Sequence, residues 1–75
     1  MVLSFVLVNV EYPSADDAME KVMKVKGVKE AYFLHGIYDI IAKIEGESLE
    51  EAKQTIFEIR HLDKVKSTVN LIVTH

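Results

Sequence analysis

The sequence predicts an α+β domain in which two β-α-β halves interleave into one sheet. Three observations lead to this prediction: a nearly continuous apolar stretch from Val2 to Val10, two helical patterns that each open at a serine, and a hairpin pattern between them. Taken in order, the segments read strand, helix, strand, strand, helix, strand. Because crossovers to a parallel strand are right-handed, they form a four-stranded antiparallel sheet with both helices on one face, the ferredoxin-like arrangement.

The composition fits one small domain covering residues 1–75, without a cofactor. The chain has no cysteine, which excludes disulfides and thiolate metal sites. Its three histidines carry no metal-ligand spacing: His35, His61 and His75. A domain of this size buries only roughly 60–70% of its unfolded surface. Self-association is therefore the expected source of additional stability, and an apolar content of 49% agrees with it.

Charge and hydropathy exclude two classes of partner. The net charge is −3, from 12 acidic and 9 basic side chains that alternate along the chain, so direct nucleic-acid binding is not expected. The apolar N-terminus lacks a basic leader and the length to span a bilayer, so no membrane partner is expected. We expect a soluble, cytoplasmic protein.

The first strand, Val2–Val10, is apolar on both faces. Alternation places one set of side chains on one face (Leu3, Phe5 and Leu7) and a second set on the other (Val6, Val8 and Val10). A strand of this kind is central and is covered on both sides. Since both helices lie on one face, we expect the other face to pack against a second copy, sheet against sheet, as a homodimer.

Each helix is predicted from a capping pattern and an apolar face. Ser14 with Asp17 and Ser48 with Glu51 both match the Ser-x-x-acid pattern, which satisfies the free N–H groups of a first helical turn. Apolar residues then recur at helical spacing, and Gly27 is the expected C-cap of the first helix. After the second helix the last strand runs from 66 to 74. Its alternate residues point to opposite faces: Val69, Leu71 and Val73 to one, Thr68, Asn70, Ile72 and Thr74 to the other.

The hairpin pattern consists of apolar strands at Ala31–Leu34 and Ile40–Ile44 around a turn at 35–39, with Gly36 able to take positive φ. In this turn Asp39 can accept from an ammonium group, Tyr38 can donate from its hydroxyl, and backbone N–H groups can hold a carboxylate. These groups suit the two charges of an amino acid. The alternative is an ordinary turn in which the aspartate hydrogen-bonds its own backbone.

Other polar residues allow weaker hypotheses. Thr68 and Asn70 lie two apart, so they either line a pocket or form the solvent side of an edge strand. His35 beside Asp39 is a possible acid/base pair. His61 near Asp63 suggests a general base, although stabilisation of a helix end explains it better.

These residues resemble the effector-binding (RAM) domain of the Lrp/AsnC regulators over essentially the whole chain. The family pattern falls on Val28, Ala31, Tyr32, Leu34, Gly36, Tyr38 and Asp39. Its most specific part is Gly-x-Tyr-Asp after an apolar strand. Full-length members carry a helix-turn-helix, so this chain resembles a stand-alone version.

The resemblance implies sheet-to-sheet dimers that assemble into rings such as octamers or decamers, with a free amino acid between dimers. It places the ligand contacts at His35, Gly36, Tyr38, Asp39, Thr68 and Asn70, where Asn70 and His35 depart from the usual hydroxyl residues. The implied function is a non-enzymatic sensor that modulates full-length Lrp/AsnC regulators. Two alternatives remain: a cofactor-free enzyme of the dimeric α+β barrel type, and an assembly module without a ligand.

Overall fold

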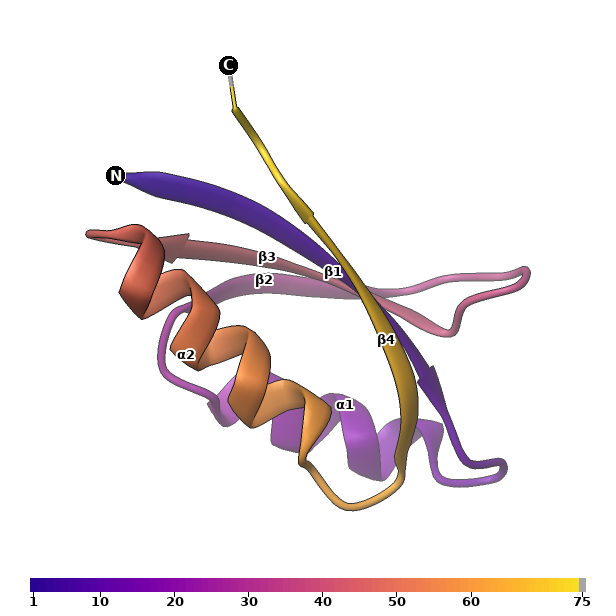
Figure 1. The fold of residues 1–75 in the computed structure, drawn as a ribbon. Coiled ribbons are helices and arrows are strands. Elements are labelled where there is room, and N and C mark those ends of the chain that lie inside the picture. The colour runs from indigo at the N-terminus through magenta and orange to yellow at the C-terminus, as the bar shows by residue number, and fades with distance from the viewer. Residues whose placement is uncertain (75) are drawn as a thin grey trace.

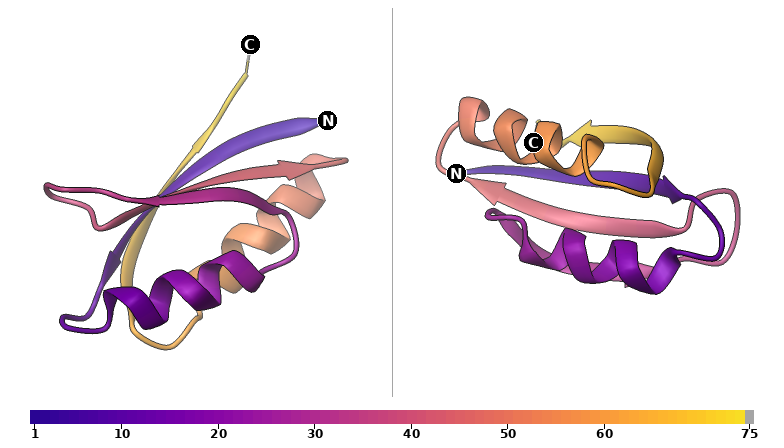
Figure 2. Two further views of the ribbon diagram at one scale, coloured as in Figure 1. Left: turned by 180° about the vertical axis from the view of Figure 1, so that it is seen from behind. Right: turned by 90° about the horizontal axis from the view of Figure 1, so that it is seen from below.

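The structure is a computed structural model that describes residues 1–74. Its elements are β1 (Val2–Val10), α1 (Ala15–Lys24), β2 (Val28–Phe33), β3 (Ile40–Gly46), α2 (Leu49–Arg60) and β4 (Val65–Ile72). The strands form one antiparallel sheet in the order β2-β3-β1-β4. Both helices lie on the same side of this sheet (Figures 1 and 2). The predicted ferredoxin-like fold is confirmed.

The core lies between the sheet and the helices. The alternation of β1 is the one predicted: Val6 and Val8 are fully buried toward the helices, whereas Phe5 and Leu7 on the other face are only half-buried. The end of β1, the neighbouring strand β3 and both helices contribute the remaining core side chains, which are Val10, Ala18, Val22, Ile40, Ala42, Ile44, Ala52, Ile56 and Ile59. These aliphatic groups hold the sheet and the helices together through the hydrophobic effect.

The other side of the sheet, which we call the helix-free face, is apolar over β1 and β4. Residues opposite each other in an antiparallel pair share a face, and Phe5 pairs with Leu71 while Leu7 pairs with both Val69 and Ile41. In the single chain Leu71 is 52% exposed and Val69 is 40% exposed. The predicted bare apolar face is therefore present.

Ion pairs and one short polar contact occupy the β2–β3 part of the helix-free face. The Lys43 ammonium lies 3.3 Å from a carboxylate oxygen of Glu30 and 3.8 Å from one of Glu45. The Tyr32 hydroxyl donates to the Glu30 carboxylate. This hydrogen bond, followed by the contacts with Lys43, lowers the pKa of Glu30, and the same hydrogen bond raises the pKa of Tyr32. The face is thus apolar on one half and ionic on the other.

Only one of the two predicted helix caps forms. Ser48 is extended (φ −141°, ψ 167°), and its hydroxyl accepts from the Glu51 N–H at 3.3 Å, as predicted. Ser14 has φ −92° and ψ 20°, and its side chain makes no cap hydrogen bond. A capping side chain reaches the first-turn N–H groups from an extended backbone. The prediction for Ser14 was therefore wrong for a conformational reason.

The end of α1 also differs from the prediction. Val25, not Gly27, is the C-cap residue. Gly27 has φ +103° and passes so close to α2 that an added Cβ would lie 2.5 Å from the Thr55 Oγ1. The Thr55 hydroxyl in turn lies 2.9 Å from the carbonyl oxygen of Lys26. Glycine is needed here for a left-handed backbone and a close approach, two residues after the C-cap Val25.

The strand ends shift slightly from the predicted positions. β4 ends at Ile72 rather than at Thr74, although the Val73 N–H still donates to the Leu3 carbonyl at 2.9 Å. The pairing of β1 with β4 changes register after Asn9, at the end of the sheet where the hairpin projects. That shift is an irregularity of the bulge type, which alternation along a single strand cannot predict.

Candidate functional site

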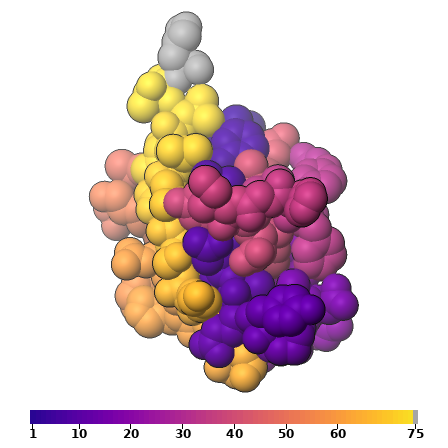
Figure 3. Space-filling model, turned by 90° about the vertical axis from the view of Figure 1, so that its right-hand side faces the viewer, coloured from indigo at the N-terminus to yellow at the C-terminus, as the bar shows by residue number. Residues whose placement is uncertain are grey.

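The β2–β3 hairpin carries four of the six predicted site residues. It projects from the end of the sheet and crosses the surface that faces the viewer in Figure 3. The loop between the strands is closed by a hydrogen bond from the Leu34 N–H to the Asp39 carbonyl, 2.8 Å long. Its apolar tip residue Ile37 is 86% exposed. The loop therefore has a fixed base and a tip available for contacts.

Asp39 ties the hairpin to the end of β1. Its N–H donates to the Val8 carbonyl at 2.9 Å, and its Oδ2 accepts from the Val10 N–H at 2.9 Å. The carboxylate thus bonds the backbone of another strand, where the alternative interpretation expected it to bond its own turn. Satisfying a half-buried N–H in this way stabilises the hairpin. The Oδ1 atom makes no hydrogen bond among the described residues and keeps its capacity to accept.

The other hairpin residues are more open. His35 and Gly36 are exposed, and Tyr38 is half-buried. Gly36 has φ 157°, close to the extended limit, and a Cβ built there would meet no atom within 4 Å. Within residues 1–74, no hydrogen bond joins His35 to Asp39, whose carboxylate binds β1 instead. Neither residue belongs to the core between the sheet and the helices. The predicted acid/base pair does not form.

The other two predicted residues lie on β4, away from the hairpin turn. Ile40 and Thr68 both pair with Val8, one on each side of β1. The backbones of the turn and of Thr68 are therefore separated by two strand spacings, about 10 Å. Thr68 is half-buried on the helix side, whereas Asn70 is exposed. The two residues were expected either to line a pocket or to form the solvent side of an edge strand. Thr68 lines a hollow, whereas Asn70 is exposed to solvent.

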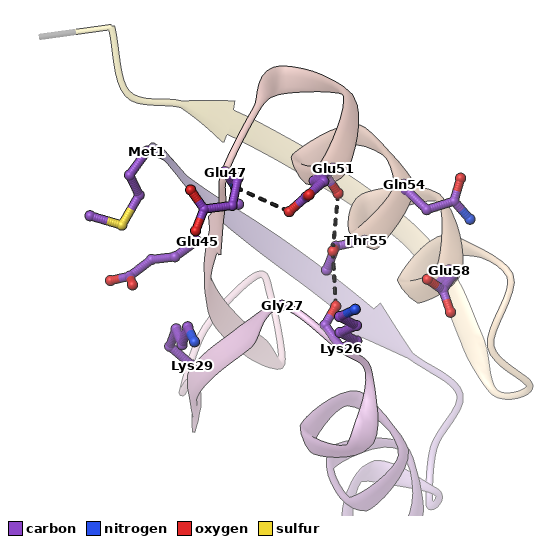
Figure 4. Close-up of a pocket in the computed structure, with 11 residues that line it drawn as sticks. Met1, Lys26, Gly27, Lys29, Glu45, Glu47, Glu51, Gln54, Thr55 and Glu58 are labelled. Atoms are coloured by element: carbon purple, nitrogen blue, oxygen red, sulfur yellow. Dashed lines mark hydrogen bonds between the residues drawn. The ribbon is translucent and has the colours of Figure 1, made fainter.

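A first hollow, which we call the α2–β3 hollow, lies between the N-terminal half of α2 and the ends of β2 and β3 (Figure 4). Its volume is about 530 Å³. Two lysines and four glutamates surround it, together with Met1, Gln54 and Thr55; the charged residues are Lys26, Lys29, Glu45, Glu47, Glu51 and Glu58. The Glu51 carboxylate is already used, since it accepts from the Glu47 N–H at 3.1 Å. None of the predicted site residues lines it.

A second hollow, the α2–β4 hollow, lies where the end of α2 meets the start of β4. Its volume is about 280 Å³, and it is lined by Arg60, His61, Lys66, Ser67 and Thr68. Of these residues, only Thr68 was predicted as a ligand contact. The available signal was His61, whose position in the sequence predicts stabilisation of the end of the second helix. For His61 that interpretation agrees with the structure, because its Nδ1 lies 2.8 Å from the Phe57 carbonyl oxygen.

The described part of the chain has neither a metal-ion cluster nor a membrane-spanning helix. Within residues 1–74 no group of three or more His, Asp or Glu side chains has the geometry to hold a metal ion. His75 lies outside the described residues. Neither helix of the described chain combines the length and the apolar character that crossing a bilayer requires.

Comparison with known proteins identifies the family. A family model described as the Lrp/AsnC ligand binding domain matches residues 3–75. The chain belongs to this family. The resemblance of the hairpin pattern is thereby confirmed, and the chain is a domain of a regulator family.

Similar proteins include a regulator, part of an enzyme and a solved structure. The HTH-type transcriptional regulator LysM of Sulfurisphaera tokodaii is 37% identical over 54 residues, which are 72% of this chain and 39% of that protein. Homocitrate synthase of Sulfolobus acidocaldarius is 34% identical over 53 residues, 71% of this chain but only 11% of the enzyme. The crystal structure of FFRP-DM1 has a TM-score of 0.90 at 35% identity, covering 97% of this chain and 99% of that one. The chain thus spans less than half the length of both curated relatives.

Proposed function

We propose that this chain is a cytoplasmic, non-enzymatic domain that senses a free amino acid. In this proposal it forms homodimers, binds the amino acid between dimers in a larger ring such as an octamer or decamer, and modulates full-length Lrp/AsnC regulators. One observation carries the proposal. The hairpin turn and the polar residues of β4 stand on opposite sides of β1, so a ligand that contacts both needs a second copy of the chain.

The hairpin supplies groups for the common part of any amino acid. The free Oδ1 of Asp39 is the acceptor for the α-ammonium group, and the backbone N–H groups around Gly36 are the donors for the α-carboxylate. The Tyr38 hydroxyl adds a neutral donor. Because the Asp39 carboxylate is held by the Val10 N–H at 2.9 Å, its free oxygen keeps a fixed direction, which reduces the entropy lost on binding. Thr68 and Asn70 of another copy complete the site.

The helix-free face supplies the first level of assembly. Its apolar half would leave Leu71, Val69 and their neighbours exposed in a monomer, and large exposed apolar patches mark interaction surfaces. The ionic half, around Lys43 and Glu30, gives the contact polar groups that fix its orientation. Two sheets that pack face to face bury the apolar half of both copies.

Regulation follows from linkage. An amino acid that bridges two dimers binds the ring but not the separate dimers, so it shifts the equilibrium toward the ring by its differential affinity. A ring of changed size or occupancy presents different surfaces to a regulator of the same family. The exposure of His35 and the use of Asp39 as a backbone acceptor argue against the alternative of a barrel-type enzyme with either residue inside its cavity.

The test is assembly mass in the presence of each amino acid. Native mass spectrometry and melting temperature are measured for the 75-residue protein with and without millimolar amino acids from a complete panel. We expect one ligand class to raise both the mass of the assembly and its melting temperature. If no amino acid changes the mass or the melting temperature of the assembly, the proposal is contradicted.

Variants at Asp39 sharpen the test. Asp39→Asn keeps an oxygen that accepts from the Val10 N–H but removes the charge that pairs with the ammonium group. We expect it to fold and assemble while its affinity for the amino acid falls about 10- to 100-fold. Asp16→Asn, the same change on the exposed start of α1, is the control and should respond like the wild type. If Asp39→Asn also keeps the wild-type affinity, Asp39 is not the ammonium acceptor.

A further inference from the structure

The α2–β4 hollow concentrates positive charge in a chain whose net charge is −3. Arg60 is the last residue of α2, His61 is its C-cap, and Lys66 is the second residue of β4. All three line the hollow with Ser67 and Thr68, and no carboxylate of residues 1–74 lines it. A concave surface with charge of one sign focuses the electrostatic potential and attracts ions of the opposite sign.

These cations have no carboxylate partner within the described chain. The ion pairs of residues 1–74 involve Lys21, Lys24 and Lys43, but neither Arg60 nor Lys66. The positions three and four residues before Arg60 are Phe57 and Ile56, so α2 offers it no helical ion pair. The acids nearest in sequence, Glu58 and Asp63, do not line the hollow.

The end of α2 cancels only part of this charge, because three of its last four carbonyl groups already have donors. The His61 N–H donates to the carbonyls of Phe57 and Glu58, and the Leu62 N–H donates to that of Ile59 at 3.2 Å. The His61 Nδ1 lies 2.8 Å from the Phe57 oxygen. It is therefore the protonated nitrogen of the ring, and the Nε2 is left for other partners. The negative end of the helix dipole is largely satisfied internally.

One hydroxyl group, that of Thr68, adds a directional donor. The Thr68 Oγ1 is shielded from solvent and has no hydrogen-bond partner among residues 1–74. A shielded hydroxyl without a hydrogen-bond partner is energetically unfavourable. A bound ion or molecule that forms this hydrogen bond would explain it. The Ser67 hydroxyl accepts from the side-chain amide of Asn9, its cross-strand partner, at 3.3 Å, so it lies on the helix-free face and not in the hollow. The Thr68 hydroxyl is therefore the one on the helix side of the sheet, where α2 ends, because Thr68 pairs with the buried Val8.

We propose that the α2–β4 hollow binds a small oxyanion, through the Arg60 and Lys66 cations and the Thr68 hydroxyl. Phosphate and carboxylate oxygens share the required chemistry, since both accept charge-assisted hydrogen bonds. A volume of about 280 Å³ is just below the range typical of drug-sized ligands and suits one such group. The inference shares Thr68 with the proposed amino-acid site but does not depend on that site.

The direct test is a titration of the whole protein with inorganic phosphate at constant ionic strength. Binding is measured by melting temperature and by the amide NMR shifts of Ser67 and Thr68. We expect a saturable response localised to the hollow. Arg60→Gln and Lys66→Gln should each weaken phosphate binding about tenfold or more. Lys53→Gln, the same loss of charge on an exposed part of α2 outside the hollow, should leave it unchanged.

Two results would overturn the inference. One is a response that never saturates, which is the general effect of phosphate on protein hydration. The other is an equal loss of binding in Lys53→Gln and in the Arg60 and Lys66 variants. Thr68→Val gives an independent check, because it removes the unpaired hydroxyl: it should fold at least as stably as the wild type and bind phosphate more weakly. Unchanged phosphate affinity in that variant counts against a role for the hydroxyl.

A parallel titration with acetate identifies the oxyanion. Binding of phosphate alone assigns the hollow to a tetrahedral oxyanion, and comparable binding of acetate extends it to carboxylates. The outcome is separable from that of the amino-acid proposal. Saturable phosphate binding by a protein that ignores every amino acid supports the hollow and contradicts amino-acid sensing. An amino-acid response without phosphate or acetate binding supports amino-acid sensing and contradicts an oxyanion site in the hollow.

Discussion

At the scale of single residues, Ser4 presents the simplest prediction. It is fully buried on the helix side of β1, and its hydroxyl has no hydrogen-bond partner within residues 1–74. Removing an unpaired buried hydroxyl also removes its desolvation cost. We expect Ser4→Ala to raise the free energy of unfolding by about 1 kcal/mol, measured from urea denaturation curves.

Ser67→Ala is the matched control for this change. Its hydroxyl is exposed and accepts a hydrogen bond from Asn9, so its removal should change the free energy of unfolding by less than about 0.5 kcal/mol. A clear loss of stability in Ser4→Ala would mean that the buried hydroxyl has a partner in solution.

Asp39 shows which properties of a single residue can be predicted from the sequence and which cannot. Its place in a Gly-x-Tyr-Asp turn marked it as a candidate ligand group. Its bond to the Val10 N–H was not predictable, because the two residues are 29 positions apart and meet only through the pairing of β3 with β1. The same applies to Thr68, whose position in a hollow depends on how α2 ends beside β4.

At the scale of elements, the two helices begin with the same sequence pattern, but we expect the two capping-position serines to contribute differently to stability. Ser48 accepts from the Glu51 N–H, but Ser14 makes no cap hydrogen bond. Ser48→Ala should therefore lower the free energy of unfolding by about 1 kcal/mol. Ser14→Ala should cost only a few tenths of that amount, since no side-chain hydrogen bond is lost.

Thermal or urea unfolding of the two variants in parallel checks this difference. Because both substitutions are serine to alanine at the start of a helix, their intrinsic effects on helix formation are matched. Equal destabilisation by the two substitutions would show that Ser14 caps α1 in solution after all.

The order of the elements could be predicted from the sequence because their periodicities are distinct. Val2–Val10 alternates between two apolar faces, whereas the helices repeat every three or four residues. Details that depend on close approach were missed, such as Gly27 against Thr55 and the register shift after Asn9. Those features arise from contacts between elements, and a local pattern carries no information about them.

At the scale of the whole molecule, the helix-free face is predicted to hold two copies together. Leu71→Lys places a charge in the middle of the apolar half, where Leu71 pairs with Phe5. Burying an unpaired ammonium group against a second sheet is strongly unfavourable. We therefore expect this variant to dissociate into folded or partly unfolded monomers of 8.5 kDa, as measured by light scattering.

Met23→Lys is the control for this experiment. Met23 is 48% exposed, close to the 52% of Leu71, but it lies on α1 and not on the helix-free face. The same change of side chain there should leave the dimer intact. If both variants dissociate equally, the loss of assembly reflects general destabilisation rather than a specific interface.

The most direct measurement for the whole account is the native mass of the unmodified protein at micromolar concentration, without added ligand. If the apolar half of the sheet is an interface, no stable monomer is seen, and every species is a multiple of a 17 kDa pair, roughly twice the 8.5 kDa chain. A homogeneous, cooperatively folding 8.5 kDa species would contradict the dimer, and with it the amino-acid site between dimers.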